Sequence, residues 1–352
     1  MAVQRRNNPS DKKPDPRPID WDKISDDELL STRICDLPIA IAGTVLEDRI
    51  NAVYGELSEK GIEFHPEVYL GDEWFSPEGD PIVSIPYYLA HPRLIKLEKA
   101  RVLEAEGESA PWFLKLLRHE MGHAISHAFR LHRYPGYTRV FGRSAEAYPN
   151  NFRPRPYSRR YVQHLFEWYA QVHPDEDYAE TFAVWLTPGR DWRTEYARWP
   201  ALRKLEFVDK MMRYVKRRPP FKKSGPKWRR VETIKMTIGY SHKLKHRAME
   251  EDFPDYFDRD LRSIFSQEPA PKAERAGRFL RRQRRHLVGT ISKYTLEKRF
   301  TVQSLIKRLA ERADQLKLYV SGSEADTLTQ VAVCITAMAK NYFFTGKFKR
   351  SR

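Results

Sequence analysis

Hydrophobic and polar residues follow a helical period along most of the chain, and a strand-like pattern in one short part of it. Apolar residues three and four positions apart predict an amphipathic helix over residues 44–60, which Gly61 ends. Residues 63–75 and 81–90 are rich in Val, Ile, Tyr and Phe and flank the turn-forming sequence Ser-Pro-Glu-Gly-Asp, so they are expected to be strands. The pattern predicts an α+β fold that is mostly helical and has a small mixed sheet.

Helical patterns continue to the end of the chain. They predict helices over residues 92–106, 109–131, 161–172, 174–186, 201–216, 273–288, 294–318 and 325–344. Residues 1–20 are polar and rich in proline, which is typical of a disordered segment. We therefore expect a disordered segment (1–20), a main domain (21–268) and a C-terminal helical segment (269–352).

The positive charge is concentrated in the C-terminal segment. The whole chain of 352 residues has a formal net charge of +16, and residues 271–352 hold 19 Lys/Arg against 6 Asp/Glu. This asymmetry favours an anionic partner such as nucleic acid or another polyanion. A solvated cationic helix face is the alternative, because no nucleic-acid-binding motif accompanies the charge.

Two cysteines, Cys35 and Cys334, exclude a disulfide framework and an all-cysteine zinc ribbon within one chain. The N-terminal residues lack the apolar run of a secretory signal, and the most apolar stretch, residues 34–46, is too short to cross a bilayer. These features indicate a soluble cytoplasmic protein without a membrane partner.

The motif with the clearest chemistry is His-Glu-Met-Gly-His at residues 119–123, within the predicted helix 109–131. Residues four apart share one helix face, so His119 and His123 can reach one metal ion while Glu120 projects beside them. Zinc prefers such nitrogen donors, and a catalytic zinc takes three protein ligands and a water molecule. The pattern predicts a zinc site in which Glu120 is the general base.

The position of the third ligand separates the classes of H-E-x-x-H protein. A metzincin would have Gly and His where this chain has Ser126 and Phe129, so that class is excluded. His127 follows His123 by one turn, but three successive turns of one helix are too long for three rings to meet one ion. His127 is expected to lie on the helix face or to contact a metal ligand without binding the metal.

The predicted helix 174–186 offers the better candidates. Acids in its first turn, Asp175 to Asp177, are explained by the helix dipole alone. Glu180 stands among apolar residues, where an unpaired carboxylate is costly to bury, so we expect it to be the third ligand. His173 and Asp177 remain alternatives, and Asp177 is also placed to bond a ligand imidazole.

With these two segments, HEMGHAISH and DEDYAETFAVWL, the chain resembles the zincin-like metallopeptidases of the glutamate-ligand (gluzincin) branch. It is most similar to bacterial proteins called putative zinc-binding metallopeptidases, over about residues 25–260. The resemblance implies a zinc peptidase with His119, His123 and Glu180 on the metal and Glu120 as the base. The Asn-Glu-x-x-x-Asp pattern of thermolysin-type enzymes is not found around Glu180.

Residue chemistry then implies a mechanism on a peptide or protein substrate. Glu120 takes a proton from a water activated by zinc, and a further donor stabilises the oxyanion. Tyr240 and His242 are the candidate donors, with buried structural roles as the alternative. Two other functions stay open: a nucleic-acid-associated protease guided by the basic segment, and a non-catalytic regulatory protein with a structural zinc site.

Overall fold

The computed structural model describes residues 19–149, 155, 157–165, 168–250, 257–268, 270–295, 297 and 299–345. Most of the disordered segment expected at residues 1–20 lies outside this part. The α-helices of the described residues are α1 (Asp26–Ser31), α2 (Val45–Glu59), α3 (Pro92–Val102), α4 (Ala110–Phe129), α5 (Tyr137–Val140), α6 (Pro174–Leu186), α7 (Trp192–Glu195), α8 (Leu202–Val215), α9 (Ile238–Glu250), α10 (Asp258–Ile264), α11 (Ala276–Thr295), α12 (Arg299–Gln315) and α13 (Glu324–Thr345).

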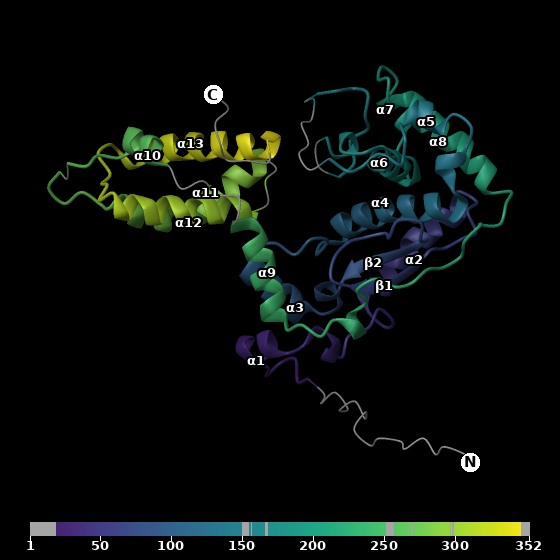
Figure 1. Cartoon of the computed structure of the whole chain (residues 1–352), viewed down its shortest axis with the longest axis horizontal. Helices are drawn as coiled ribbons and strands as arrows, with labels where there is room; N and C mark the ends of the chain where they lie inside the picture. The colour runs from purple at the N-terminus through teal and green to yellow at the C-terminus, as the bar shows by residue number, and fades with distance from the viewer. Residues whose placement is uncertain are drawn as a thin grey trace, which may run out of the picture.

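The strands of the described residues are β1 (Glu67–Gly71) and β2 (Ile82–Pro86), which pair in parallel. Ser84 in β2 also forms a single antiparallel bridge with Phe75, in which each residue donates its N–H to the carbonyl of the other. All five residues of β2 are buried, and α4 packs on this strand. The fold is therefore mostly helical with a small sheet, which confirms the fold class predicted from the sequence (Figure 1).

A first hydrophobic core joins elements from α1 to the start of α9. Its largest fully buried side chains include Tyr87, Phe113, Tyr137, Tyr178 and Phe182. α4 lies between α2 and α6 and contacts both, and α6 also packs on α8. The motif helix α4 is thus central to this core, which fixes the position of its polar residues.

The helix predicted over residues 161–172 does not form in the described part of that range. Only Tyr169–Gln171 form a short 3₁₀ helix, and Trp168 before it has left-handed backbone angles. The preceding segment makes long-range contacts in place of helical ones: the Leu165 N–H donates to the carboxylate of Glu180, and Lys115 donates to the His164 carbonyl. Tertiary hydrogen bonds outweigh the local helical pattern here.

A second hydrophobic core contains α10, α11, α12 and α13. Its residues begin at Phe257, whereas the first core ends at Ile238. The two cores therefore separate before the expected boundary at 268/269, since Leu261 and Phe265 pack with the C-terminal helices. Figure 1 shows these helices to one side of the first core, beyond α9.

Within the described residues, no helix combines the length and the apolarity that crossing a membrane requires.

Candidate metal centre

His119 and His123 of the H-E-x-x-H motif lie against α6, and the two helices approach closely at Gly122. A Cβ atom at this position would lie 3.0 Å from the Ala179 Cα and 3.2 Å from a ring carbon of Phe182. α6 begins at Pro174, and His173 caps it by accepting the Asp175 N–H. The contact brings the first two turns of α6 over the motif histidines.

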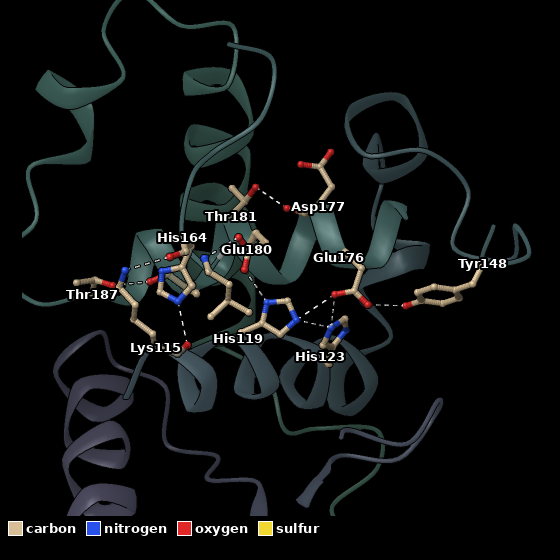
Figure 2. A network of polar contacts seen from close by, with 12 residues as sticks. Lys115, His119, His123, Tyr148, His164, Glu176, Asp177, Glu180, Thr181 and Thr187 are labelled. Carbon is tan, nitrogen blue, oxygen red and sulfur yellow. Dashed lines mark hydrogen bonds and ion pairs between the residues drawn. The ribbon is translucent and has the colours of Figure 1, made fainter. Parts of the chain in front are cut away.

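Three donor atoms meet between the helices, from His119, His123 and Glu176. The Nε2 atoms of the two histidines are 3.1 Å apart, and Glu176 Oε2 lies 3.0 Å from His119 Nε2 and 3.3 Å from His123 Nε2. Ligands about 2.0–2.1 Å from a tetrahedral zinc ion are separated by similar distances of about 3.3 Å. Figure 2 shows the three side chains converging from α4 and α6.

Glu180 lies on the opposite side of the His119 ring. Its Oε1 is 2.9 Å from His119 Nδ1, and its Oε2 accepts the Leu165 N–H at 3.0 Å. A carboxylate on Nδ1 favours the tautomer with the proton on that nitrogen, which leaves the Nε2 lone pair toward Glu176. The geometry thus differs from the sequence expectation: Glu176 stands with the histidines, and Glu180 orients one of them.

The donor set fits a cation. In the tautomer set by Glu180, His119 Nε2 and Glu176 Oε2 are both acceptors at 3.0 Å, so a proton or a metal ion must lie between them. Burial lowers the pKa of His119, but hydrogen bonds to Glu176 and Glu180 outweigh this effect and raise it well above its usual value. A metal ion would replace that proton, and two imidazoles with one carboxylate are a zinc-type donor set.

Glu120 is the buried carboxylate that lies beside this cluster without joining it. It is 9% exposed, and no described residue hydrogen-bonds its carboxylate. Burial raises the pKa of Glu120 above its usual value, while His119 and His123 act against this. A carboxylate that is free of protein partners and close to the donor atoms is placed to accept a proton from a water molecule.

A tyrosine from the segment before α6 contacts the other oxygen of Glu176. The Tyr148 hydroxyl donates to Glu176 Oε1 at 2.9 Å, and its ring stacks on His173 with centroids 3.9 Å apart. His173 in turn lies 2.8 Å from the Glu146 carbonyl through Nε2. These contacts hold Glu176 with its Oε2 toward the histidines, as Figure 2 shows.

A second tyrosine, Tyr169, lies against the motif, with its ring centroid 5.6 Å from that of His119. Burial raises the pKa of Tyr169, and the carboxylates of Glu176 and Glu120 raise it further. The hydroxyl is therefore protonated at neutral pH, and no described residue hydrogen-bonds it. It is available to donate to a substrate oxygen.

The structure places Tyr240 and His242, the expected oxyanion donors, outside the cluster of donor atoms. Both are on α9, where Tyr240 is 54% exposed and His242 is 4% exposed. His242 Nε2 lies 2.7 Å from Glu98 on α3, and Lys245 pairs with the same carboxylate. The contacts of His242 and Lys245 with Glu98 anchor α9 to α3, and neither Tyr240 nor His242 hydrogen-bonds the donor atoms of the cluster.

The other histidine and aspartate candidates have partners of their own. His127 is 3.2 Å from the Asp80 carbonyl, and burial lowers its pKa to about 4. Asp177 pairs with Lys204 at 2.5 Å and does not contact an imidazole, and burial raises its pKa to about 7 against the effect of that lysine. His173 caps α6. The alternatives to a glutamate ligand thus have structural partners.

Glu176, Tyr148 and Tyr169 are the site residues that sequence reasoning missed. The helix dipole alone explains Glu176 as a first-turn acid, yet this residue stands four residues before Glu180, the same spacing as His119 and His123. Residues four apart share one helix face, so Glu176 lies on the same face of α6 as Glu180, and this spacing is the sequence signal for Glu176. Glu176 and Glu180 also reproduce the Glu-x-x-x-Asp spacing noted above, with Glu in place of Asp. For the two tyrosines, no sequence pattern pointed to the site.

Replacing Gly122 with Ala should separate α4 and α6 and weaken metal binding. The added methyl group meets the α6 backbone, and overpacking of this kind costs about 1–3 kcal/mol, more than the gain of up to about 1 kcal/mol in helix propensity. Thermal unfolding and zinc titration measure both effects. Gly55→Ala on α2 is the control, because its Cβ would meet no atom within 4 Å. Equal zinc affinity in the two variants would exclude a role of Gly122 in the site.

Comparison with protein families gives a match to the part of the chain that holds the metal centre. A family model described as "Putative zinc-binding metallo-peptidase" matches residues 97–211, which contain the motif helix, Glu176 and Glu180. No curated protein and no solved structure matches the chain. The match agrees with the resemblance noted from the motifs, and the cluster of two histidines and a glutamate fits a zincin-like site.

Proposed function

We propose that this protein is a zinc-dependent peptidase whose metal is held by His119, His123 and Glu176. The observation that carries the proposal is the convergence of three donor atoms within 3.3 Å of one another, beside a carboxylate that no described residue bonds. The family match to residues 97–211 supports the same reaction class.

The residues of the site divide the chemistry among them. A zinc ion bound there supplies a Lewis acid for the substrate carbonyl and a water molecule of lowered pKa. The Glu120 carboxylate would accept a proton from the water that attacks the substrate carbonyl carbon, and would deliver it to the leaving amine nitrogen as the C–N bond breaks. Glu180 holds the His119 ring through Nδ1, and Tyr148 holds Glu176 through Oε1.

Tyr169 is the candidate donor to the oxyanion, in place of Tyr240 and His242. Tyr169→Phe removes only the hydroxyl, so zinc affinity should stay the same while kcat falls by about 10²–10³-fold, the usual effect of losing one such donor. Turnover of a fluorogenic peptide and zinc titration give the two values. Tyr240→Phe is the matched control, and an equal fall in kcat for both variants would remove Tyr169 from this role.

Metal removal tests the proposed function as a whole. Chelation should stop hydrolysis of an unfolded protein substrate, and one equivalent of zinc should restore it. Hydrolysis that persists after complete removal of the metal would contradict the proposal.

A non-catalytic zinc site is the second candidate function. A structural zinc site is closed by four protein ligands and has no use for a general base. Here the described residues supply three converging donors, and Glu120 remains beside them without a partner. These features favour the peptidase.

A further inference from the structure

The second core carries a row of positive charges that the peptidase site does not use. The row, here the cationic stripe, consists of Arg278, Arg282, Arg285, Lys293 and Arg299. The first four lie on one face of α11, at spacings close to one or two helical turns. All five are exposed. Between Arg278 and Lys293 the stripe extends about 22 Å along the helix.

The side chain of Arg299 from α12 lies beside this face of α11 at Gly289, between Arg285 and Lys293. A Cβ atom at Gly289 would lie 3.9 Å from Nη2 of Arg299, which is an ordinary van der Waals separation. Arg299 thus continues the row where α11 itself has no side chain.

Few carboxylates neutralise the stripe. α11 contains no acidic residue, and among the described residues only Arg282 of the stripe forms an ion pair, with Glu274 and Glu324. Arg278 also lies in the first turn of α11, where the helix dipole makes a cation unfavourable. The helix dipole therefore does not account for this charge.

An exposed aromatic ring stands at the end of the stripe. Tyr294 is 67% exposed, and the Lys293 ammonium lies 5.4 Å from its ring centroid. A cationic groove or stripe combined with an exposed ring is the arrangement that binds single-stranded nucleic acid, with phosphates on the cations and a base stacked on the ring. A membrane-surface helix would instead need an exposed apolar face, whereas the apolar face of α11 is buried in the second core.

We propose that the cationic stripe and Tyr294 form a binding site for single-stranded nucleic acid, independent of the metal centre. The phosphates bind Arg278, Arg285, Lys293 and Arg299, and Tyr294 stacks on an unpaired base. This site brings the proposed peptidase to proteins that are bound to nucleic acid, and that consequence rests on the proposed function. The binding itself does not, because it requires neither zinc nor hydrolysis.

Fluorescence anisotropy of the full chain with a labelled 20-nucleotide oligothymidylate, at several salt concentrations, tests the site. The triple variant Arg278→Ala, Arg285→Ala, Lys293→Ala should bind at least about tenfold more weakly at 0.15 M salt. The slope of log affinity against log salt concentration should be less negative by about 2 for this variant. Each phosphate contact with a single strand contributes about −0.7 to the slope, and the variant loses three contacts. The control is Arg203→Ala, Lys210→Ala, Arg217→Ala, which removes the same charge from the region of α8 and should have little effect.

Tyr294→Ala separates nucleic acid from other polyanions. It should weaken binding of the oligothymidylate about tenfold through loss of stacking, and leave binding of heparin unchanged. Equal losses in the stripe variant and its control, or an unchanged affinity for the oligothymidylate in Tyr294→Ala, would overturn the proposal. Circular dichroism of each variant excludes unfolding as the cause. If the protein binds the oligothymidylate as expected but does not hydrolyse peptides, only the proposed function is contradicted.

Discussion

Replacing Glu120 with Gln should abolish hydrolysis and leave zinc affinity and the fold unchanged. Glu120 is buried beside the donor atoms but is not one of them, and no described residue bonds its carboxylate. Gln has nearly the same shape, yet it cannot accept the proton of the attacking water at neutral pH. Loss of general-base catalysis lowers kcat by about 10²–10⁴-fold. Turnover of an unfolded protein substrate, with zinc content measured on the same sample, provides the test.

Glu206→Gln is the matched control for this variant. It makes the same chemical change at an exposed position of α8 and should retain full activity. Unchanged turnover in Glu120→Gln would remove Glu120 as the general base. Loss of zinc from Glu120→Gln would instead make it a metal ligand, contrary to the observed geometry.

Glu176→Gln should lose most of its zinc affinity, whereas Glu180→Gln should lose less. Glu176 Oε2 lies 3.0 and 3.3 Å from the two Nε2 atoms, so in the proposed zinc site the variant removes a negatively charged ligand of the metal. Glu180 acts through its hydrogen bond to His119 Nδ1. Mutation of a residue that hydrogen-bonds a metal ligand lowers metal affinity by about 10–100-fold. Competition titration with a chromophoric chelator gives both affinities. We expect a loss greater than about 100-fold for Glu176→Gln.

The reverse order of the two affinities would contradict this account. Glu180 is fully buried, so its variant also needs a check for folding by thermal unfolding. If Glu180→Gln loses zinc while it remains folded and Glu176→Gln keeps it, then Glu180 is the ligand that the sequence alone suggested.

The sequence predicted the two helices of the site because their apolar patterns are long and regular. Residues 174–186 form α6 as expected, and the predicted helix 109–131 is α4, observed at 110–129. The H-E-x-x-H motif specified three residues because its spacing places them on one helix face. Such local geometry can be read without knowledge of the tertiary fold.

The choice between Glu176 and Glu180 depends on how α4 and α6 cross, and this is a tertiary property. Both acids stand on the same face of α6, one turn apart, so helical periodicity does not distinguish them. The close contact at Gly122 sets the crossing and puts Glu176 on the side of the Nε2 atoms. A burial argument selected Glu180, which is indeed buried, but a hydrogen bond to an imidazole satisfies its carboxylate as well as a metal would.

The segment before α6 was also beyond prediction from local pattern. Its apolar spacing resembles a helix, but Leu165 donates its N–H to Glu180 and thereby supports the site. Tyr169 contacts the His119 ring from this segment, and Tyr148 contacts Glu176 from the loop that precedes it. Neither tyrosine belongs to a helical or strand-like hydrophobic period. Long-range polar contacts decided its conformation, and these leave no repeating signal in a single sequence.

The most direct test of the central claim is a crystal structure of the zinc-loaded protein with anomalous data at the zinc absorption edge. We expect one strong anomalous peak per chain, about 2.0–2.2 Å from His119 Nε2, His123 Nε2 and one oxygen of Glu176. His119 Nδ1 should keep its hydrogen bond to Glu180. A peak bound by Glu180 in place of Glu176, or no peak between α4 and α6, would contradict the account.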